Sequence, residues 1–236
     1  DFEVNITVPS RFVVWATGEL QNPGRVFKNK VLKRFEEARR SNEIVKVIEH
    51  KDYQNGDVTK TSETHTWEFV AKGVPDFAFA ASSGSAWDAV SHVVDRKTGR
   101  RALISAVYPD SVIHYQDVAM IARNTVDYMS NRLPGFPYPY PQATVFANGR
   151  INSGMEFPMI ANDGAPLDYA DLQGLTFHEI LHNYFPFFMG TNERKYAFMD
   201  EGWARYFPKG FLEIHAPGDN YFQRTIAQYE GFAGRE

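Results

Sequence analysis

The pattern His-Glu-x-x-His at residues 178–182 constrains this chain most, because it lies within a strongly helical stretch. That stretch is predicted to be a helix over residues 169–185, with Asp168 as its N-cap and a proline closing it. On a helix, His178 and His182 project from one face, about 6 Å apart at the backbone. Both ring nitrogens can then reach one zinc ion at about 2.0 Å. The apolar opposite face is expected to pack on a core.

Two acidic residues complete a possible metal site around these histidines. Glu179 follows the first histidine, where its carboxylate is placed to take a proton from metal-bound water rather than to bind the metal. Glu201, in a helix predicted at residues 193–207, is the candidate third ligand, because a catalytic zinc takes three protein ligands and keeps one open position. The alternative is an accidental spacing of ordinary helix-surface residues, with Glu201 a solvated carboxylate.

Composition sets further bounds. The 236 residues are 43% hydrophobic, enough for a sizeable core, and include no cysteine, which leaves His, Asp and Glu as metal ligands. Acids and bases are interspersed at a net charge of −4, so we expect no nucleic-acid partner and no polybasic membrane anchor. No apolar run approaches the roughly 20 residues of a transmembrane segment. The chain starts without a methionine or signal peptide, and we expect it to be part of a longer protein. Cytoplasmic and periplasmic or extracellular locations are all compatible.

The hydrophobic pattern divides the chain into two predicted parts. Residues 1–72 are mostly strands, and residues 2–8 alternate between apolar and polar, the period of a strand with one buried face. Residues 73–236 begin with short strands, change to a helical period over residues 112–133 and return to a strand at 143–148. Further strands are expected at residues 11–17, 43–49, 64–71, 76–82, 90–95 and 102–107, and a short helix at 31–40.

A second motif, Ser-Gly-Met-Glu at residues 153–156, lies upstream of the histidines. Together these motifs resemble the gluzincin zinc aminopeptidases, the family of aminopeptidase N and the leukotriene-hydrolase type of enzyme. The family signature is HExxH, eighteen residues and then a glutamate, and eighteen residues separate His182 from Glu201 here. The family also carries a Gly-x-Met-Glu-Asn loop on the edge strand of its substrate cleft. The resemblance covers about residues 1–210.

The resemblance implies one bound Zn²⁺, whose ligands would be His178, His182 and Glu201. It implies that Glu179 is the general base, which accepts a proton as the activated water attacks a scissile carbonyl. The implied activity is zinc-dependent hydrolysis of the N-terminal peptide bond of peptides. The implied fold is α+β, a thermolysin-like catalytic domain, incomplete at its C-terminal side and preceded by the end of an N-terminal β domain.

The resemblance also implies a substrate-binding loop. Glu156 would hold the free α-amino group of a peptide substrate by charge, with Gly154 and Met155 beside it. The alternative for Glu156 is an exposed glutamate at a strand end. Two other functions stay open: a zinc endopeptidase of the wider group, in which Glu156 has no amine to bind, and a non-catalytic relative that binds peptides or proteins.

Some positions depart from the family pattern. Phe157 stands where the family loop commonly has Asn. Asp200 stands where the family has Asn, and its added negative charge would need a cationic neighbour such as Arg205. In relatives a tyrosine several dozen residues after the third ligand stabilises the oxyanion. Only 35 residues follow Glu201, so we expect that tyrosine beyond residue 236. We interpret as structural the tyrosines Tyr206, Tyr221 and Tyr229.

Overall fold

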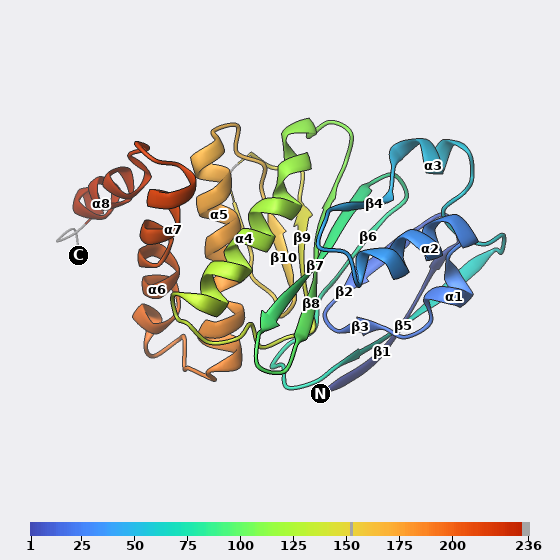
Figure 1. The fold of residues 1–236 in the computed structure, drawn as a ribbon, viewed down its shortest axis with the longest axis horizontal. Coiled ribbons are helices and arrows are strands. Elements are labelled where there is room, and N and C mark those ends of the chain that lie inside the picture. The colour runs from blue at the N-terminus through green and yellow to red at the C-terminus, as the bar shows by residue number, and fades with distance from the viewer. Residues whose placement is uncertain (152, 233–236) are drawn as a thin grey trace.

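A mixed five-stranded sheet forms the centre of the computed structural model, which describes residues 1–151 and 153–232 (Figure 1). The strand order across the sheet is β10-β9-β8-β7-β4. β8, β9 and β10 are parallel to one another, whereas β7 and β4 run antiparallel to their neighbours. The strands span Val45–Ile48 (β4), Ala86–Asp95 (β7), Arg100–Tyr108 (β8), Gln142–Ala147 (β9) and Ile160–Asp163 (β10). Of the predicted second part, residues 152 and 233–236 lie outside the described residues.

Two helices cover one face of this sheet. α4 (Val118–Asn131) follows a 3-10 turn at Ile113–Asp117 and packs on β7 and β8. α5 (Tyr169–Leu181) packs on α4 and on β10. The helix predicted at residues 112–133 is confirmed, although its first turn is a 3-10 turn.

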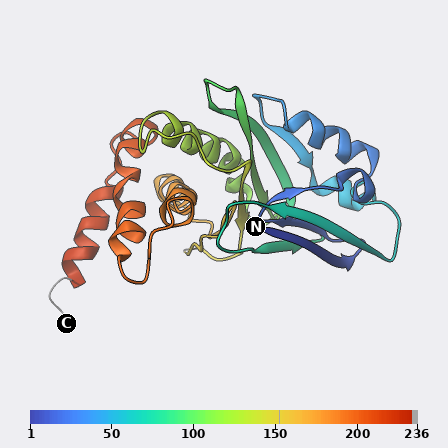
Figure 2. The same cartoon turned by 90° about the horizontal axis from the view of Figure 1, so that it is seen from below.

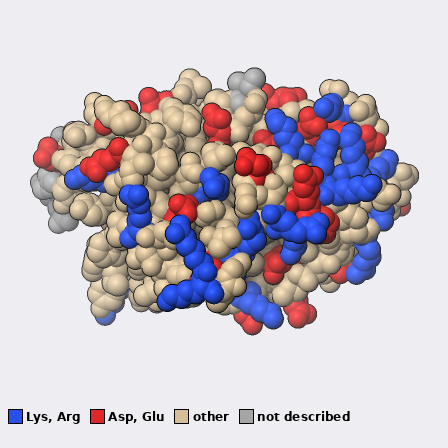
Figure 3. All heavy atoms as spheres, viewed as in Figure 1, with Lys and Arg blue, Asp and Glu red and all other residues tan. Residues whose placement is uncertain are grey.

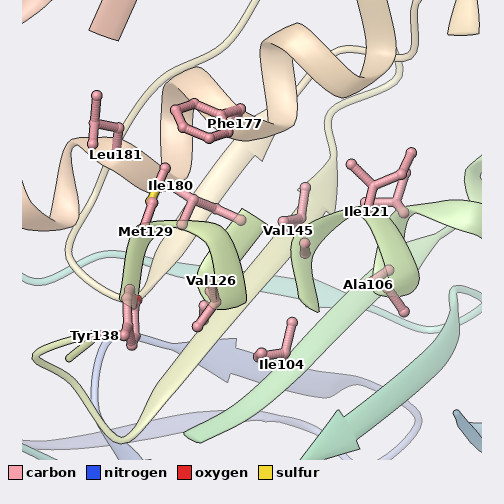
Figure 4. Close-up of a cluster of buried hydrophobic side chains, with 14 of the residues drawn as sticks. Ile104, Ala106, Ile121, Val126, Met129, Tyr138, Val145, Phe177, Ile180 and Leu181 are labelled. Atoms are coloured by element: carbon pink, nitrogen blue, oxygen red, sulfur yellow. The ribbon is translucent and has the colours of Figure 1, made fainter. Parts of the chain in front are cut away.

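A continuous core of aliphatic and aromatic side chains fills the space between the sheet and these helices (Figure 4). Ile104 and Val145 of the sheet, Val126 and Met129 of α4, and Ile180 of α5 are each at most 1% exposed. Full burial of a side chain of this size contributes about 1.5–3 kcal/mol relative to exposure. α5 is therefore held firmly against the sheet, and the two histidines are held with it.

The other face of the sheet packs against the N-terminal elements, as the view from below shows (Figure 2). Aromatic rings fill this interface, where the Trp87 ring of β7 lies 5.4 Å from Phe35 and 5.9 Å, edge-on, from Trp15. The strands here form a sheet of order β1-β5-β3 and a β2-β6 pair. The elements are β1 (Phe2–Pro9), β2 (Val13–Ala16), β3 (Glu19–Leu20), α1 (Pro23–Val26), α2 (Asn29–Ala38), α3 (His50–Gln54), β5 (Thr64–Ala71) and β6 (Phe79–Ser82).

The predicted strands and the early helix are present, with shifted ends. The predictions at residues 90–95 and 102–107 are the two arms of the longer β7–β8 hairpin. β4 lies within the predicted first part, yet it pairs with β7 of the predicted second part through Val45 and Ala89. The division of the chain at residue 72 remains a prediction, and the central sheet draws strands from both sides of it.

The C-terminal helices differ most from expectation. The helix predicted over residues 193–207 is wrong: the structure has a 3-10 turn at Ala197–Met199 and then α6 (Glu201–Tyr206). Asp200 separates the two because its backbone (φ −119°, ψ −94°) is not helical. Pro208 does not end a helix but occupies the first turn of α7 (Pro208–His215), where the missing N–H costs nothing. α5 likewise ends earlier than predicted, followed by a π-helical turn (Asn183–Phe188), and α8 (Tyr221–Phe232) was not predicted.

The described helices include none that combines the length and the apolar character needed to cross a bilayer. On the face shown in Figure 3, acidic and basic side chains are interspersed, as the sequence predicted.

A buried carboxylate ties α2 to the start of α3. Asp52 has a fully buried side chain and lies 2.6 Å from Lys30 Nζ and 2.7 Å from an Arg34 guanidinium nitrogen. It also accepts a hydrogen bond of 2.9 Å from the backbone N–H of Glu49, which closes a capping box. Burial opposes ionisation, but the bonds from Lys30, Glu49 and Arg34 outweigh it and lower the pKa of Asp52.

We expect Asp52→Asn to lower the free energy of unfolding at pH 7 by about 3 kcal/mol, because two cations lose their buried partner. The folded-state pKa is lowered, so the stabilisation is complete above the unfolded-state pKa of about 4 and is lost as pH falls through the folded-state value. Denaturant melts at pH 7 and pH 3 would measure both effects. Asp57→Asn is the control: its side chain, 39% exposed, pairs with Lys30 at 3.2 Å, and the expected loss is below about 1 kcal/mol. Equal losses in both variants would contradict this account.

Candidate metal centre

α5 begins after Asp168 and buries its apolar face, as the sequence predicted. Asp168 caps it, with its carboxylate accepting a 3.0 Å hydrogen bond from the backbone N–H of Asp171. The two histidines near its C-terminal end are largely buried: His178 is 7% exposed and His182 is fully buried. Their rings meet edge to face, with centroids 4.8 Å apart. Two imidazoles therefore converge in a protected place, one helical turn apart.

The candidate ligand atoms have the spacing of a tetrahedral zinc site. His178 Nε2 lies 3.3 Å from His182 Nε2 and 3.3 Å from Glu201 Oε2, and all three ligand atoms lie within 4.8 Å of one another. Ligands at 2.0–2.1 Å from a tetrahedral ion are separated by about 3.3–3.4 Å along each edge. Two of the three edges match this value, so the residues present fit one Zn²⁺.

Asp200 fixes the orientation of one imidazole. His182 Nδ1 lies 2.6 Å from Asp200 Oδ1 and 3.2 Å from the Phe185 carbonyl oxygen, so Nδ1 carries the proton and Nε2 presents its lone pair to the site. Burial alone would lower the pKa of His182, but the hydrogen bond that its Nδ1–H donates to Asp200 outweighs this effect, and the pKa is raised. The partner of Asp200 is thus the Nδ1–H group of His182. Among the described residues no ion pair joins Asp200 to Arg205, and the expectation of that pairing is wrong.

Glu201 owes its position to the break in the chain just before it. It is the first residue of α6, so its carboxylate stands at the positive end of that short helix, and its side chain is 53% exposed. The hydrogen bond with His178 is the main cause that lowers the pKa of Glu201 to about 2, against an opposing effect of burial. The carboxylate is therefore ionised throughout the neutral range and is available to a cation.

Glu179 is buried beside the histidines. Its side chain is 4% exposed, and Oε1 lies 3.9 Å from His178 Nε2. Burial, and next the charge of Asp163, raises the pKa of Glu179 to about 9, so this carboxyl has a high affinity for a proton. A divalent cation nearby would favour its ionised form. Gly154 lies directly over this carboxylate, and a Cβ at that position would overlap Oε1.

The loop of residues 153–157 lies along the edge of the sheet without being a regular strand. Met155 exchanges backbone hydrogen bonds of 3.2 and 2.9 Å with Asn162 of β10. The backbone N–H of Gly164 also donates to the Ser153 carbonyl at 2.5 Å, and that of Ile160 donates to the Phe157 carbonyl at 3.2 Å. The loop therefore runs antiparallel along β10 at the sheet edge, as expected, although it is not a regular strand. Glu156 comes within 4.8 Å of ligand atoms of Glu179 and His182, whereas Met155 is 47% exposed.

These residues line one open cavity of about 590 Å³. The Gly154–Glu156 loop forms part of its wall, together with His178, Glu179 and Glu201. α8 contributes residues that the sequence reasoning set aside or missed, because no motif marks them. They are Tyr221, Arg224, Thr225 and Gln228. The cavity has the volume of a site for a small ligand or a short peptide segment.

Comparison with solved structures finds proteins that share this mixed arrangement of helices and sheet. Two structures of an M1 zinc metallopeptidase from Deinococcus radiodurans match 99% of this chain, each with a TM-score of 0.62 and 14% identity. A mutant form bound to the substrate Tyr-Ser-Ala matches with a TM-score of 0.60 at the same identity and coverage of this chain.

The chain spans less than half of those structures, 45%, 44% and 44% of their respective chains. At 14% identity the likeness establishes the fold. No protein-family model and no curated protein sequence matches the chain. The protein therefore has a mixed helix-and-sheet fold similar to that of M1 zinc metallopeptidases.

We expect the purified protein to bind about one zinc ion per chain, measured by elemental analysis after dialysis. Asp200→Ala should weaken zinc binding about 10–100-fold in competition with a chromogenic chelator, because His182 loses the group that orients it. Asp200→Asn should retain most of the affinity, since an amide oxygen still accepts from Nδ1. An alanine variant that binds zinc as tightly as the asparagine variant would contradict this role of Asp200.

We expect Gly154→Ala to lower the free energy of unfolding by about 1–3 kcal/mol, because its methyl group would overlap the Glu179 carboxylate and displace it. Gly84→Ala is the control, since a Cβ there meets nothing within 4 Å. Denaturant melts of the two variants and the wild type would measure the difference. Equal stability of the two variants would contradict the close approach of Gly154 to Glu179.

Proposed function

We propose that this protein is a zinc-dependent aminopeptidase. The observation that carries the proposal is the pair of 3.3 Å separations that join His178 to His182 and to Glu201, with a buried carboxylate, Glu179, beside them. The similarity in fold to M1 zinc metallopeptidases supports it, and one such structure is bound to a tripeptide substrate. His178, His182 and Glu201 would hold the zinc ion.

Zn²⁺ bound by such ligands lowers the pKa of a coordinated water to about 7 and polarises a carbonyl oxygen. Glu179 accepts the proton of the attacking water at Oε1, the oxygen that lies toward His178, and later gives it to the leaving amine. Its burial keeps bulk water from the carboxyl, and a divalent cation nearby would favour the ionised form that accepts the proton. Asp200 keeps His182 in the tautomer whose Nε2 faces the ion.

Glu156 supplies the preference for a free N-terminus. Its carboxylate comes within 4.8 Å of ligand atoms of Glu179 and His182, so an ammonium group bound to it would lie near the reacting bond. A hydrogen bond to a charged group contributes about 1.5–3 kcal/mol. In a cavity of about 590 Å³ this contact would fix the first residue of the peptide, and an endopeptidase would have no ammonium group to place there.

The test is hydrolysis of peptides and aminoacyl anilides by the full chain, with and without a chelator, and on free and N-acetylated substrates. We expect loss of activity on zinc removal, recovery on zinc addition and little cleavage of acetylated peptides. Glu179→Gln should lower kcat by about 10²–10⁴ with zinc retained. Glu156→Gln should lower kcat/KM for free peptides about 10–100-fold. Glu213→Gln, on the exposed face of α7, is the matched control.

The outcomes separate the remaining functions. Equal cleavage of acetylated and free peptides, with Glu156→Gln unaffected, would indicate an endopeptidase. Measurable peptide binding without turnover in the zinc-loaded protein would indicate a non-catalytic relative. Activity that is indifferent to zinc removal would overturn the proposal.

A further inference from the structure

Besides Glu179, the structure buries another acidic side chain, Asp163, which the proposed reaction does not use. Asp163, the last residue of β10, is fully buried, and neither of its carboxyl oxygens has a hydrogen-bond partner among the described residues. Two more buried oxygens, Oε2 of Glu179 and the hydroxyl of the fully buried Tyr115, likewise have no hydrogen-bond partner among the described residues.

β10, which carries Asp163, packs on α5, which carries Glu179. The charges of Asp163 and Glu179 both act on the pKa of Tyr115, after the larger effect of burial, and the charge of Asp163 acts on Glu179 more strongly than that of any other residue, so the three groups are near neighbours. Four buried oxygens without a partner thus come from β10, α5 and the turn before α4. Buried polar atoms in folded proteins are almost always hydrogen-bonded, to protein or to internal water.

An ionised Asp163 does not fit this environment. Nothing among the described residues neutralises it: no Lys, Arg or His forms an ion pair with it. Burying an unpaired carboxylate costs several kcal/mol, and a second negative charge on Glu179 adds repulsion. A protonated carboxyl avoids both costs and becomes a hydrogen-bond donor. Burial accordingly raises the pKa of Asp163 well above its usual range.

We propose that Asp163 is a neutral carboxylic acid which, with the Tyr115 hydroxyl, hydrogen-bonds the rear oxygen Oε2 of Glu179 through internal water. An internal water typically makes two to four hydrogen bonds, and the four oxygens supply that number. Oε2 is then held from behind, while Oε1 stays directed toward His178 and the reacting water. Asp163 is thus a positioning residue, and the inference rests on the proposed function of Glu179 as general base.

Two substitutions of similar size distinguish this role from simple packing. Asp163→Asn keeps one donor and one acceptor, as a neutral acid does, whereas Asp163→Leu keeps neither. With zinc content unchanged, we expect kcat/KM within about threefold of wild type for the asparagine variant and 10–100-fold lower for the leucine variant. Tyr115→Phe, which keeps the ring packing, should lower kcat/KM by a smaller factor. Asp57→Asn, on the surface, is the control.

Infrared spectroscopy detects the protonation state of the Asp163 carboxyl directly, and this measurement does not depend on peptidase activity. The zinc-loaded wild-type protein at neutral pH should show the carbonyl band of a protonated carboxyl that Asp163→Asn removes and Asp57→Asn leaves in place. Absence of that band, or an asparagine variant as slow as the leucine variant, would overturn the inference. If the leucine variant fails to fold, the infrared carbonyl band and the kcat/KM of Tyr115→Phe still test the inference. A wild-type protein without any peptidase activity would contradict the proposed function, while the band would still report the state of Asp163.

Discussion

The candidate metal centre depends on one requirement: three possible ligand atoms must be held at the corners of a tetrahedron by a chain that has no disulfide to fix them. Two of them come from a single helix, so their spacing is set by the helical turn and by the burial of α5 against α4 and β10. The third comes from elsewhere, and its place is set by the non-helical backbone of Asp200. Adjacent residues thus hold two different histidines, Asp200 contacting His182 and Glu201 contacting His178.

The carboxyl groups around this site have different pKa values because their surroundings differ, although the groups are chemically alike. Glu201 is half-exposed and hydrogen-bonded to an imidazole, and its pKa falls to about 2. Glu179 is buried among other acids, and its pKa rises to about 9. Asp163 is buried further from solvent and has no protein partner among the described residues. One kind of side chain can therefore supply a permanent ligand, a proton acceptor and a neutral donor within a short distance.

The sequence predicted the parts of this arrangement that depend on short-range spacing. The i, i+4 histidines, the Asp168 cap and the alternating strands follow from local geometry, and the structure contains them. The break at Asp200 was missed because helical propensity does not report it: the residue contacts His182, eighteen positions back, and local patterns carry no sign of such a contact. Pro208 was misread for a related reason, since a proline that ends one helix can begin the next.

Contacts across the sheet were beyond the reach of sequence patterns. The group of Asp163, Tyr115 and Glu179 joins three distant segments, and no motif marks two of its members. The loop of residues 153–157 lies along β10 as the resemblance implied, but the close approach of Gly154 to the Glu179 carboxylate joins two segments that no local pattern connects. Such packing depends on the whole fold and not on the residues next to each other in the chain.

β4 carries a consequence for how this protein can be divided. The strand comes from the N-terminal stretch, but it forms the outer border of the sheet that carries the metal centre at its far edge. A shortened chain that began after residue 72 would leave the backbone of β7 unpaired and the indole of Trp87 without its aromatic neighbours. Unpaired, apolar borders of this kind associate with one another. The part of the chain after residue 72 is therefore a poor candidate for an autonomous unit, and the early strands contribute to the stability of the fold as much as the histidine helix does.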